Sequence, residues 1–127
     1  MGSDTRRRRA GYRSGLLAES AAALLLRAKG WRILARRMRT PVGEIDIVAE
    51  RNGTVAFVEV KLRRDLATAR GALAPRQRRR LENAARWWLA ANPRYLASTC
   101  RFDLVAVNRW LFPVHLPNIH EAGGRDP

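Results

Sequence analysis

The sequence predicts an α/β domain in the order helix, strand, strand, strand, helix, strand, and a short run near its C-terminal end is a candidate edge strand. Two segments, 14–29 and 75–91, carry apolar residues at helical spacing. Runs of alternating apolar and polar residues lie between and after these segments. The pair Asn52-Gly53 joins two of these runs, and it is a strong signal for a β-hairpin. Helices that alternate with a hairpin favour a layered α/β domain.

The composition predicts a polyanionic partner. The chain has 25 Lys and Arg residues against 11 Asp and Glu, a formal net charge of +14. In a compact protein this charge favours nucleic acid over an anionic membrane surface. The single cysteine excludes a disulfide framework and a Cys-based zinc site. The longest apolar run, 21–26, is too short to span a membrane, and no secretion signal is evident. We therefore expect a cytoplasmic protein without a membrane partner.

Three regions divide the chain. Residues 1–11 include an arginine run, 6–9, and nothing that could pack, which predicts a disordered basic arm. The arm either solubilises the protein or contacts phosphates, and both interpretations stay open. A single domain is expected over residues 12–120, which is long enough to bury a core. Residues 121–127 are expected to form a flexible tail.

The first helix is expected to start at a Ser14 cap and to end at Gly30. Its only acid, Glu19, lies at the edge of the apolar stripe. Glu19 is either a solvated flank residue or a third carboxylate of a site. The predicted apolar stripe consists of Leu17, Ala21, Leu24, Leu25 and Ala28.

A first strand is predicted over residues 31–37. The arginines Arg36, Arg37 and Arg39 lie at its end, just before the hairpin. They could neutralise nucleic-acid phosphates, or they could form a solvated edge that discourages aggregation.

The hairpin over residues 43–61 organises the predicted site. With a two-residue loop, residues whose numbers sum to 105 face each other, so Asp46 lies opposite Glu59 and Glu44 lies opposite Lys61. Because side chains alternate along a strand, these four share one face, unless a register slip of one residue separates the acids. The other face is the predicted core face, with Ile45, Ile47, Ala49, Ala56, Val58 and Val60.

Two carboxylates across a ladder destabilise a hairpin unless a cation lies between them. Lys61 or a bound Mg²⁺ ion can supply that charge, and Mg²⁺ prefers oxygen ligands. In metal-assisted phosphodiester hydrolysis the ion binds a phosphate oxygen and lowers the pKa of its bound water. Asp46 and Glu59 would hold the Mg²⁺ or Mn²⁺ ion, and Lys61 would orient the water or stabilise developing charge.

The rest of the chain supplies arginines and a second helix. Residues 62–74, with Arg63 and Arg64, are expected to form a mobile loop beside the site. The helix from Pro75 carries Gln77 on its inward face, either as a packing residue or as support behind the acids. Its predicted buried residues are Leu81, Ala84, Ala85, Trp88 and Leu89, and its candidate phosphate contacts are Arg76, Arg78, Arg79 and Arg80.

The C-terminal part predicts a strand over residues 101–107. Residues 110–114 are the candidate edge strand, because Pro113 cannot donate to a ladder. His115 and His120 have no metal-ligand spacing to the acids, and we interpret both as surface or packing residues.

The hairpin also resembles a known motif. Residues 43–46 (Gly-Glu-Ile-Asp) followed by 57–61 (Phe-Val-Glu-Val-Lys) resemble the divided D…ExK motif of the PD-(D/E)xK, restriction-endonuclease-like nucleases. Residues 30–34, 101–103 and 115–119 further resemble the YraN-type family of uncharacterised bacterial proteins. This similarity spans about residues 15–122.

The resemblance implies a restriction-endonuclease-like three-layer domain, a mixed sheet flanked by helices. It implies that Asp46, Glu59 and the backbone carbonyl of Val60 ligate Mg²⁺, that Lys61 is catalytic, and that Glu19 can complete the site. Glu44 would support these groups from behind. One departure is that Gln77-Arg78 stands where relatives commonly have a Lys-Gln pair.

Two hypotheses follow. The first is a Mg²⁺-dependent nuclease that acts on structured or branched nucleic acid, with DNA favoured over RNA. A homodimer is compatible with it, since nucleases that cut two strands are often dimers. The second is a non-catalytic, arginine-rich nucleic-acid-binding module with a vestigial acidic site, whose affinity should fall steeply with salt.

Overall fold

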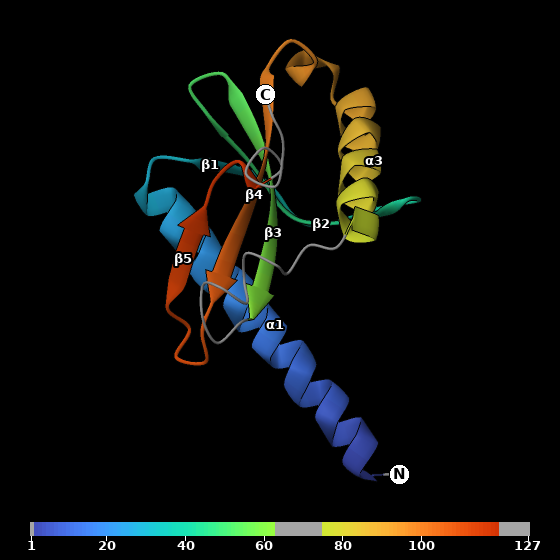
Figure 1. Ribbon diagram of the computed structural model, residues 1–127, viewed down its shortest axis with the longest axis vertical. Helices are drawn as coiled ribbons and strands as arrows, with labels where there is room; N and C mark the ends of the chain where they lie inside the picture. The colour runs from blue at the N-terminus through green and yellow to red at the C-terminus, as the bar shows by residue number, and fades with distance from the viewer. Residues whose placement is uncertain (1, 63–74, 120–127) are drawn as a thin grey trace.

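The computed structural model describes residues 2–62 and 75–119, with side chains described from Gly15 onward. The elements are α1 (Gly2–Ala28), β1 (Arg32–Thr40), β2 (Gly43–Arg51), β3 (Thr54–Leu62), α3 (Pro75–Ala91), a 3₁₀ turn η1 (Pro93–Tyr95), β4 (Thr99–Val107) and β5 (Pro113–Leu116). The strands form one sheet in the order β1-β2-β3-β4-β5 (Figure 1). Only the β3–β4 pair is parallel, so the described sheet is mixed, and the predicted element order is confirmed.

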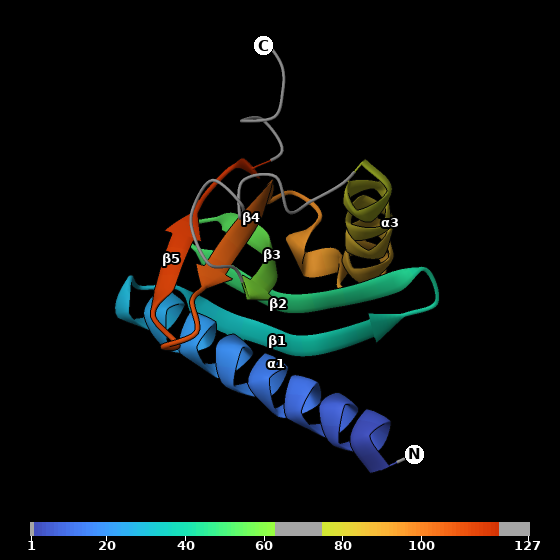
Figure 2. The ribbon, with the colours of Figure 1, turned by 60° about the horizontal axis from the view of Figure 1, so that its bottom comes forward.

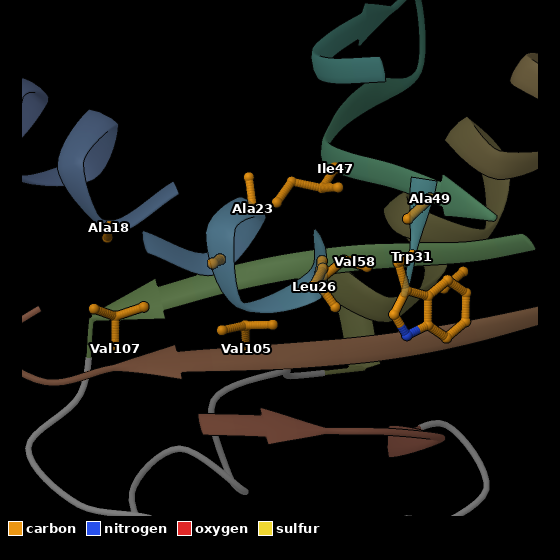
Figure 3. Close-up of a cluster of buried hydrophobic side chains, with 11 residues drawn as sticks. Ala18, Ala23, Leu26, Trp31, Ile47, Ala49, Val58, Val105 and Val107 are labelled. Atoms are coloured by element: carbon orange, nitrogen blue, oxygen red, sulfur yellow. The ribbon is translucent and has the colours of Figure 1, made fainter. Parts of the chain in front are cut away.

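The two helices cover opposite faces of the sheet, which gives three layers (Figure 2). On the α1 face, Leu26 and Trp31 pack on Val58 and Val105 (Figure 3). On the α3 face, Phe57 contacts Trp88 edge to face at a centroid distance of 5.8 Å. Burying both faces explains why the runs 55–58 of β3 and 104–107 of β4 are continuously apolar.

Helix α1 differs from the prediction in its start and in its buried face. It begins at Gly2, so the helix includes the segment predicted as a disordered arm. Arg and Ala favour helix, and this segment has no proline to stop it. Leu17 and Leu24 are 54% and 68% exposed, so the predicted stripe was wrong. Small side chains lie against the sheet instead, together with the buried Glu19: Ala18, Ala22, Ala23 and Leu26.

The hairpin register is confirmed. The β2–β3 pairs run from Arg51↔Thr54 to Ile47↔Val58, and each sums to 105. Asn52 and Gly53 have φ values of 50° and 79°, as a type I′ turn requires. The ladder ends one pair before Asp46 and Glu59, so these two residues lie where β2 and β3 separate.

One predicted core residue changes sides. Ile47 packs under α1, but Ile45 packs under α3, although residues two apart share a face in a regular strand. The adjacent strand β1 is irregular at the same place, since Arg37 has a φ of 52° between the pairs Arg36↔Ile47 and Met38↔Ile45. The alternation of side chains along β2 is therefore interrupted at Asp46, which lies between Ile45 and Ile47.

The edge strand is shorter and later than predicted. β5 spans Pro113–Leu116, and residues 108–112 form the turn that connects it to β4. Pro113 begins the strand, where a missing N–H is tolerated.

His115 on β5 is a packing residue rather than a surface one. Its side chain is 4% exposed, and its Nε2 lies 2.7 Å from Oδ2 of the fully buried Asp103.

Candidate functional site

A cavity of about 320 Å³ opens where β2 and β3 separate beside α1. Four structural elements contribute to its wall, and they come from three distant parts of the sequence. It therefore exists only in the folded chain. Its lining residues are Gly15, Leu16, Ala18 and Glu19 of α1, Arg37 of β1, Glu44 and Asp46 of β2, and Val60, Lys61 and Leu62 of β3.

Asp46 is the central carboxylate of this cavity. Its Oδ2 accepts a hydrogen bond of 2.8 Å from the backbone N–H of Val60, across the end of the ladder. Burial, then the nearby negative charge of Glu59, raises the pKa of Asp46 from 3.8 to about 7, although the Val60 N–H acts in the opposite direction. The two predicted acids are therefore close enough to interact, and the site is electrostatically unfavourable without a cation.

Lys61 supplies part of the missing positive charge. Its Nζ lies 3.1 Å from Oε2 of Glu59, and both side chains are 19% exposed. Lys61 lines the cavity, whereas Glu59 is not part of the lining and contacts it only through this ion pair. The predicted opposition of Glu44 and Lys61 does not form, because β2 and β3 have already separated. Glu44 instead lies 3.5 Å from Arg39 Nε on the neighbouring strand.

Glu19 lies in the cavity wall but is held by another partner. Its Oε2 accepts a hydrogen bond of 3.2 Å from Arg36 Nε, and Arg36 Nη2 also donates to Ser20 at 3.1 Å. Glu19 is 4% exposed, so the guanidinium compensates a buried charge. This pair fixes the carboxylate of α1 against β1 on the wall of the cavity.

The predicted arginines fall into three groups. Arg37 lines the cavity, while Arg36 and Arg39 pair with glutamates as described. Arg63 and Arg64 lie outside the described residues. Gln77 and the arginines 76 and 78–80 lie on the first turns of α3, across the sheet from α1, and Gln77 does not line the cavity. A Cβ added to Gly43 would lie 3.3 Å from the Arg80 carbonyl oxygen, so this end of α3 lies close to the start of β2.

The acids near the cavity determine which kind of metal ion the site could bind. In the part of the chain that the structure describes, no three His, Cys, Asp or Glu side chains are grouped closely enough to bind one ion. Mg²⁺ needs fewer protein ligands, because it is often held by one or two carboxylates and completes its shell with water and phosphate oxygens. Asp46 and Glu59, with the Val60 carbonyl at the same point of β3, match that requirement, and a cation would relieve the raised pKa of Asp46.

A second polar cluster was missed by the sequence analysis. Asp103 receives two hydrogen bonds from Arg101, at 3.0 and 2.9 Å, and one from the backbone N–H of Asn118 at 3.1 Å. His115 binds Asp103 through Nε2 and lies 2.6 Å from Lys29 Nζ through Nδ1. The available signal was a buried acid in an apolar strand, but its partners are distant in sequence. This cluster ties β4 and β5 to the end of α1.

The fold and the cavity together define an α/β domain with a mixed five-stranded sheet and a paired acid and lysine on its central hairpin. The profile of the uncharacterised protein family UPF0102 matches residues 18–107, so the chain belongs to this family, and the expected YraN-type membership is confirmed. No helix in the described residues is both long and apolar enough to cross a membrane.

Bacterial relatives support this assignment over nearly the whole chain. A UPF0102 protein of Rhodopseudomonas palustris strain BisB5 is 50% identical over 113 residues, which cover 89% of this chain and 86% of the relative. One from Bradyrhizobium sp. strain ORS 278 is 51% identical over 84% of this chain and 76% of its own length. One from Chelativorans sp. strain BNC1 is 46% identical over 96% of this chain and 99% of its own.

Proposed function

We propose that this protein is a Mg²⁺- or Mn²⁺-dependent nuclease that hydrolyses phosphodiester bonds in structured or branched nucleic acid, with DNA favoured over RNA. The observation that carries the proposal is that Asp46, the Val60 backbone and Lys61 come together in one cavity where β2 and β3 separate, with Glu59 ion-paired to Lys61. Burial, and then the negative charge of Glu59, raises the pKa of Asp46 to about 7 beside Lys61 in an open cavity. Such an arrangement is costly to the fold, and strongly shifted pKa values cluster at functional sites.

Each group has a distinct role in this proposal. The carboxylates of Asp46 and Glu59 and the carbonyl oxygen of Val60 would hold the ion, which when bound polarises a phosphate oxygen and acidifies water. The Val60 N–H keeps Asp46 oriented toward the end of β3. Lys61 places an ammonium beside the position where negative charge develops on the phosphate. Glu19, held by Arg36, would complete the site from the α1 side.

The excess of arginine supports a nucleic-acid substrate. A net charge of +14 attracts the phosphate backbone without sequence preference. Arg37 lies in the cavity wall, where it can contact a phosphate next to the reacting one. The arginines on the first turns of α3 add further positive charge on the other face of the sheet.

The test compares Asp46→Asn with the wild type and with Glu50→Gln, a carboxylate-to-amide change at the opposite end of β2. Single-stranded, duplex, flap and four-way-junction DNA would be incubated with Mg²⁺ or Mn²⁺, and with EDTA. We expect cleavage by the wild type and Glu50→Gln only with the metal, a loss of at least about a hundredfold in Asp46→Asn, and binding that survives in all three. Equal cleavage by Asp46→Asn would contradict the proposal.

A non-catalytic nucleic-acid-binding module is the second candidate. The observation that favours it is that Glu19, Glu44 and Glu59 each already have a cationic partner. In that case the arginines give salt-dependent binding, and calorimetric titration with Mg²⁺ or Mn²⁺ shows no binding to the wild type. Metal binding that is lost in Asp46→Asn would instead favour the nuclease.

A further inference from the structure

The turn between β4 and β5, residues 108–112, is a rigid loop with aromatic side chains on its outside. The Asn108 side chain accepts hydrogen bonds from the backbone N–H groups of Trp110 at 2.9 Å and Phe112 at 3.0 Å. The Leu111 N–H donates to the Asn108 carbonyl at 2.9 Å, and the Asn108 N–H donates to the Phe112 carbonyl at 3.2 Å. Leu111 has a φ of 63°, which is unusual for a bulky residue. Four hydrogen bonds within the turn therefore define its backbone conformation.

This loop exposes large apolar side chains that do not belong to any core cluster of the described residues. Trp110 is 75% exposed and Phe112 is 64% exposed. Aromatic residues normally contribute to cores and interfaces, so two exposed aromatics on one tied loop indicate a contact with something outside the chain. The Arg109 guanidinium lies 4.8 Å from the centre of the Trp110 ring. It covers one face of the indole and leaves a stacking surface beside a positive charge.

The loop lies at the end of the sheet that carries the carboxylate cavity. Strands β3 and β4 are parallel, with Lys61 opposite Ala106 and Leu62 opposite Val107. Lys61 and Leu62 line the cavity, and the loop begins at the residue after Val107. Strand spacing and rise place the loop tip within about 15 Å of Lys61. Figure 1 shows the β4–β5 connection beside the ends of the β3 and β4 arrows.

We propose that Trp110, backed by Arg109 and flanked by Phe112, stacks on an unpaired base of the nucleic acid whose backbone enters the cavity. Aromatic side chains bind unpaired bases of any sequence, because every base has a π face, whereas bases inside a duplex are already stacked on each other. The surface is thus suited to single strands, flaps or branch points rather than to plain duplex. This inference rests on the proposed function, which places the nucleic acid at the cavity.

A second copy of this chain is a less suitable occupant. Two molecules with a net charge of +14 each repel one another, and Arg109 would be placed against the other copy's positive field. A nucleic acid suits both groups, because its bases can stack on the Trp110 ring and its phosphates can pair with the Arg109 guanidinium.

The test measures binding in EDTA, so that cleavage is not required. A labelled oligonucleotide would be titrated as single strand, flap and fully paired duplex, with Trp110→Leu, Trp110→Phe and Trp87→Leu. Leucine keeps the apolar character but not the π face, phenylalanine keeps both, and Trp87 is a tryptophan on α3 with 39% exposure. We expect Trp110→Leu to weaken single-strand and flap binding about tenfold or more, with duplex binding unchanged. Trp110→Phe and Trp87→Leu should bind as the wild type does.

An abasic position in the strand provides a second measurement. Removing the stacked base should weaken the wild type but not Trp110→Leu, since that variant has already lost the contact. If Trp110→Leu binds every form as the wild type does, or if it alters only the sedimentation of the protein alone, stacking is wrong. If the wild type cleaves DNA as proposed but Trp110→Leu gives either of these results, the stacking inference is overturned and the nuclease proposal stays in place.

Discussion

Asp46 is held in the metal-free protein as an acid with a pKa of about 7, because burial and the Glu59 charge both disfavour the carboxylate. A cation binds only the ionised form. Between its ordinary pKa of 3.8 and the folded value of about 7, the folded protein therefore keeps a proton that a metal ion must displace. In the proposed nuclease, binding of the ion and loss of the proton are thus coupled at Asp46.

This coupling predicts that metal affinity rises with pH. At pH 6 about one molecule in ten has Asp46 ionised, and at pH 8 about nine in ten, so the apparent affinity for Mn²⁺ should rise roughly tenfold. Calorimetry in two buffers of different ionisation enthalpy measures both the affinity and the proton released. Glu50→Gln should give the same profile as the wild type. An affinity that is equal at the two pH values would show that Asp46 is not a ligand.

At the scale of elements, the hairpin was predictable because its information is local. Asn52-Gly53 specifies the turn, and the turn fixes the register of β2 and β3 as far as Ile47↔Val58. The interrupted alternation of β2 at Asp46 was not predictable, because it accompanies a positive φ at Arg37 on another strand. Arginine normally avoids a positive φ, so the sequence gives no sign of it. The sequence therefore identifies the acids of the candidate site but not the cavity in which they lie.

The buried face of α1 shows a different limit. Leucines and alanines occur all around this helix, so periodicity alone did not identify the side that meets the sheet. Close packing selects the side with small residues, Ala18 and Ala22, and leaves Leu17 and Leu24 exposed. Glu19 is buried as a consequence of that choice. The burial of Glu19 depends on how α1 packs on the sheet, and the local sequence pattern does not determine that packing.

The contact of Gly43 with α3 gives a prediction at this scale. Its φ is 153°, and a Cβ would lie 3.3 Å from the Arg80 carbonyl oxygen and 3.7 Å from Arg80 Cβ. Gly43→Ala should therefore lower the free energy of unfolding by about 1–3 kcal/mol, from backbone strain and from displacement of α3. Urea denaturation measures it.

Gly53→Ala is the matched control for this prediction. Gly53 has a φ of 79°, but no atom lies within 4 Å of its added Cβ. Its cost should come from backbone strain alone, about 1 kcal/mol. If Gly43→Ala is as stable as the wild type, the close approach of β2 to α3 is not a constraint on the fold.

For the whole molecule, the two acidic sites have opposite electrostatic characters. Asp46 lacks adequate cationic compensation and lies in an open cavity, as expected of a group that binds a ligand. Asp103 is fully buried and satisfied by Arg101, His115 and the Asn118 N–H. Burial alone would raise its pKa, but these hydrogen bonds outweigh burial and lower the pKa below 3.8. One site serves a proposed ligand, and the other joins β4, β5 and α1.

The sign of the Asp103 shift predicts how stability depends on pH. Because the folded pKa is depressed, its contribution is fully present above the unfolded value of 3.8 and is lost as pH falls through the folded value. Asp103→Asn should therefore cost about 2–4 kcal/mol at pH 7, since it leaves the half-buried Arg101 beside an uncharged group. The difference from the wild type should shrink below about pH 4, as the wild-type carboxylate gains its proton.

Urea denaturation at pH 7, 5 and 3 measures this difference, with Glu50→Gln as the control, because Glu50 forms an ion pair with the exposed Arg32. Such surface pairs contribute about 0–1 kcal/mol, so the control should lie close to the wild type at every pH. A cost for Asp103→Asn that is small at pH 7, or that grows on acidification, would contradict the assigned role. It would mean that the packing of α1 on β3 and β4, rather than the buried carboxylate, holds the C-terminal strands in place.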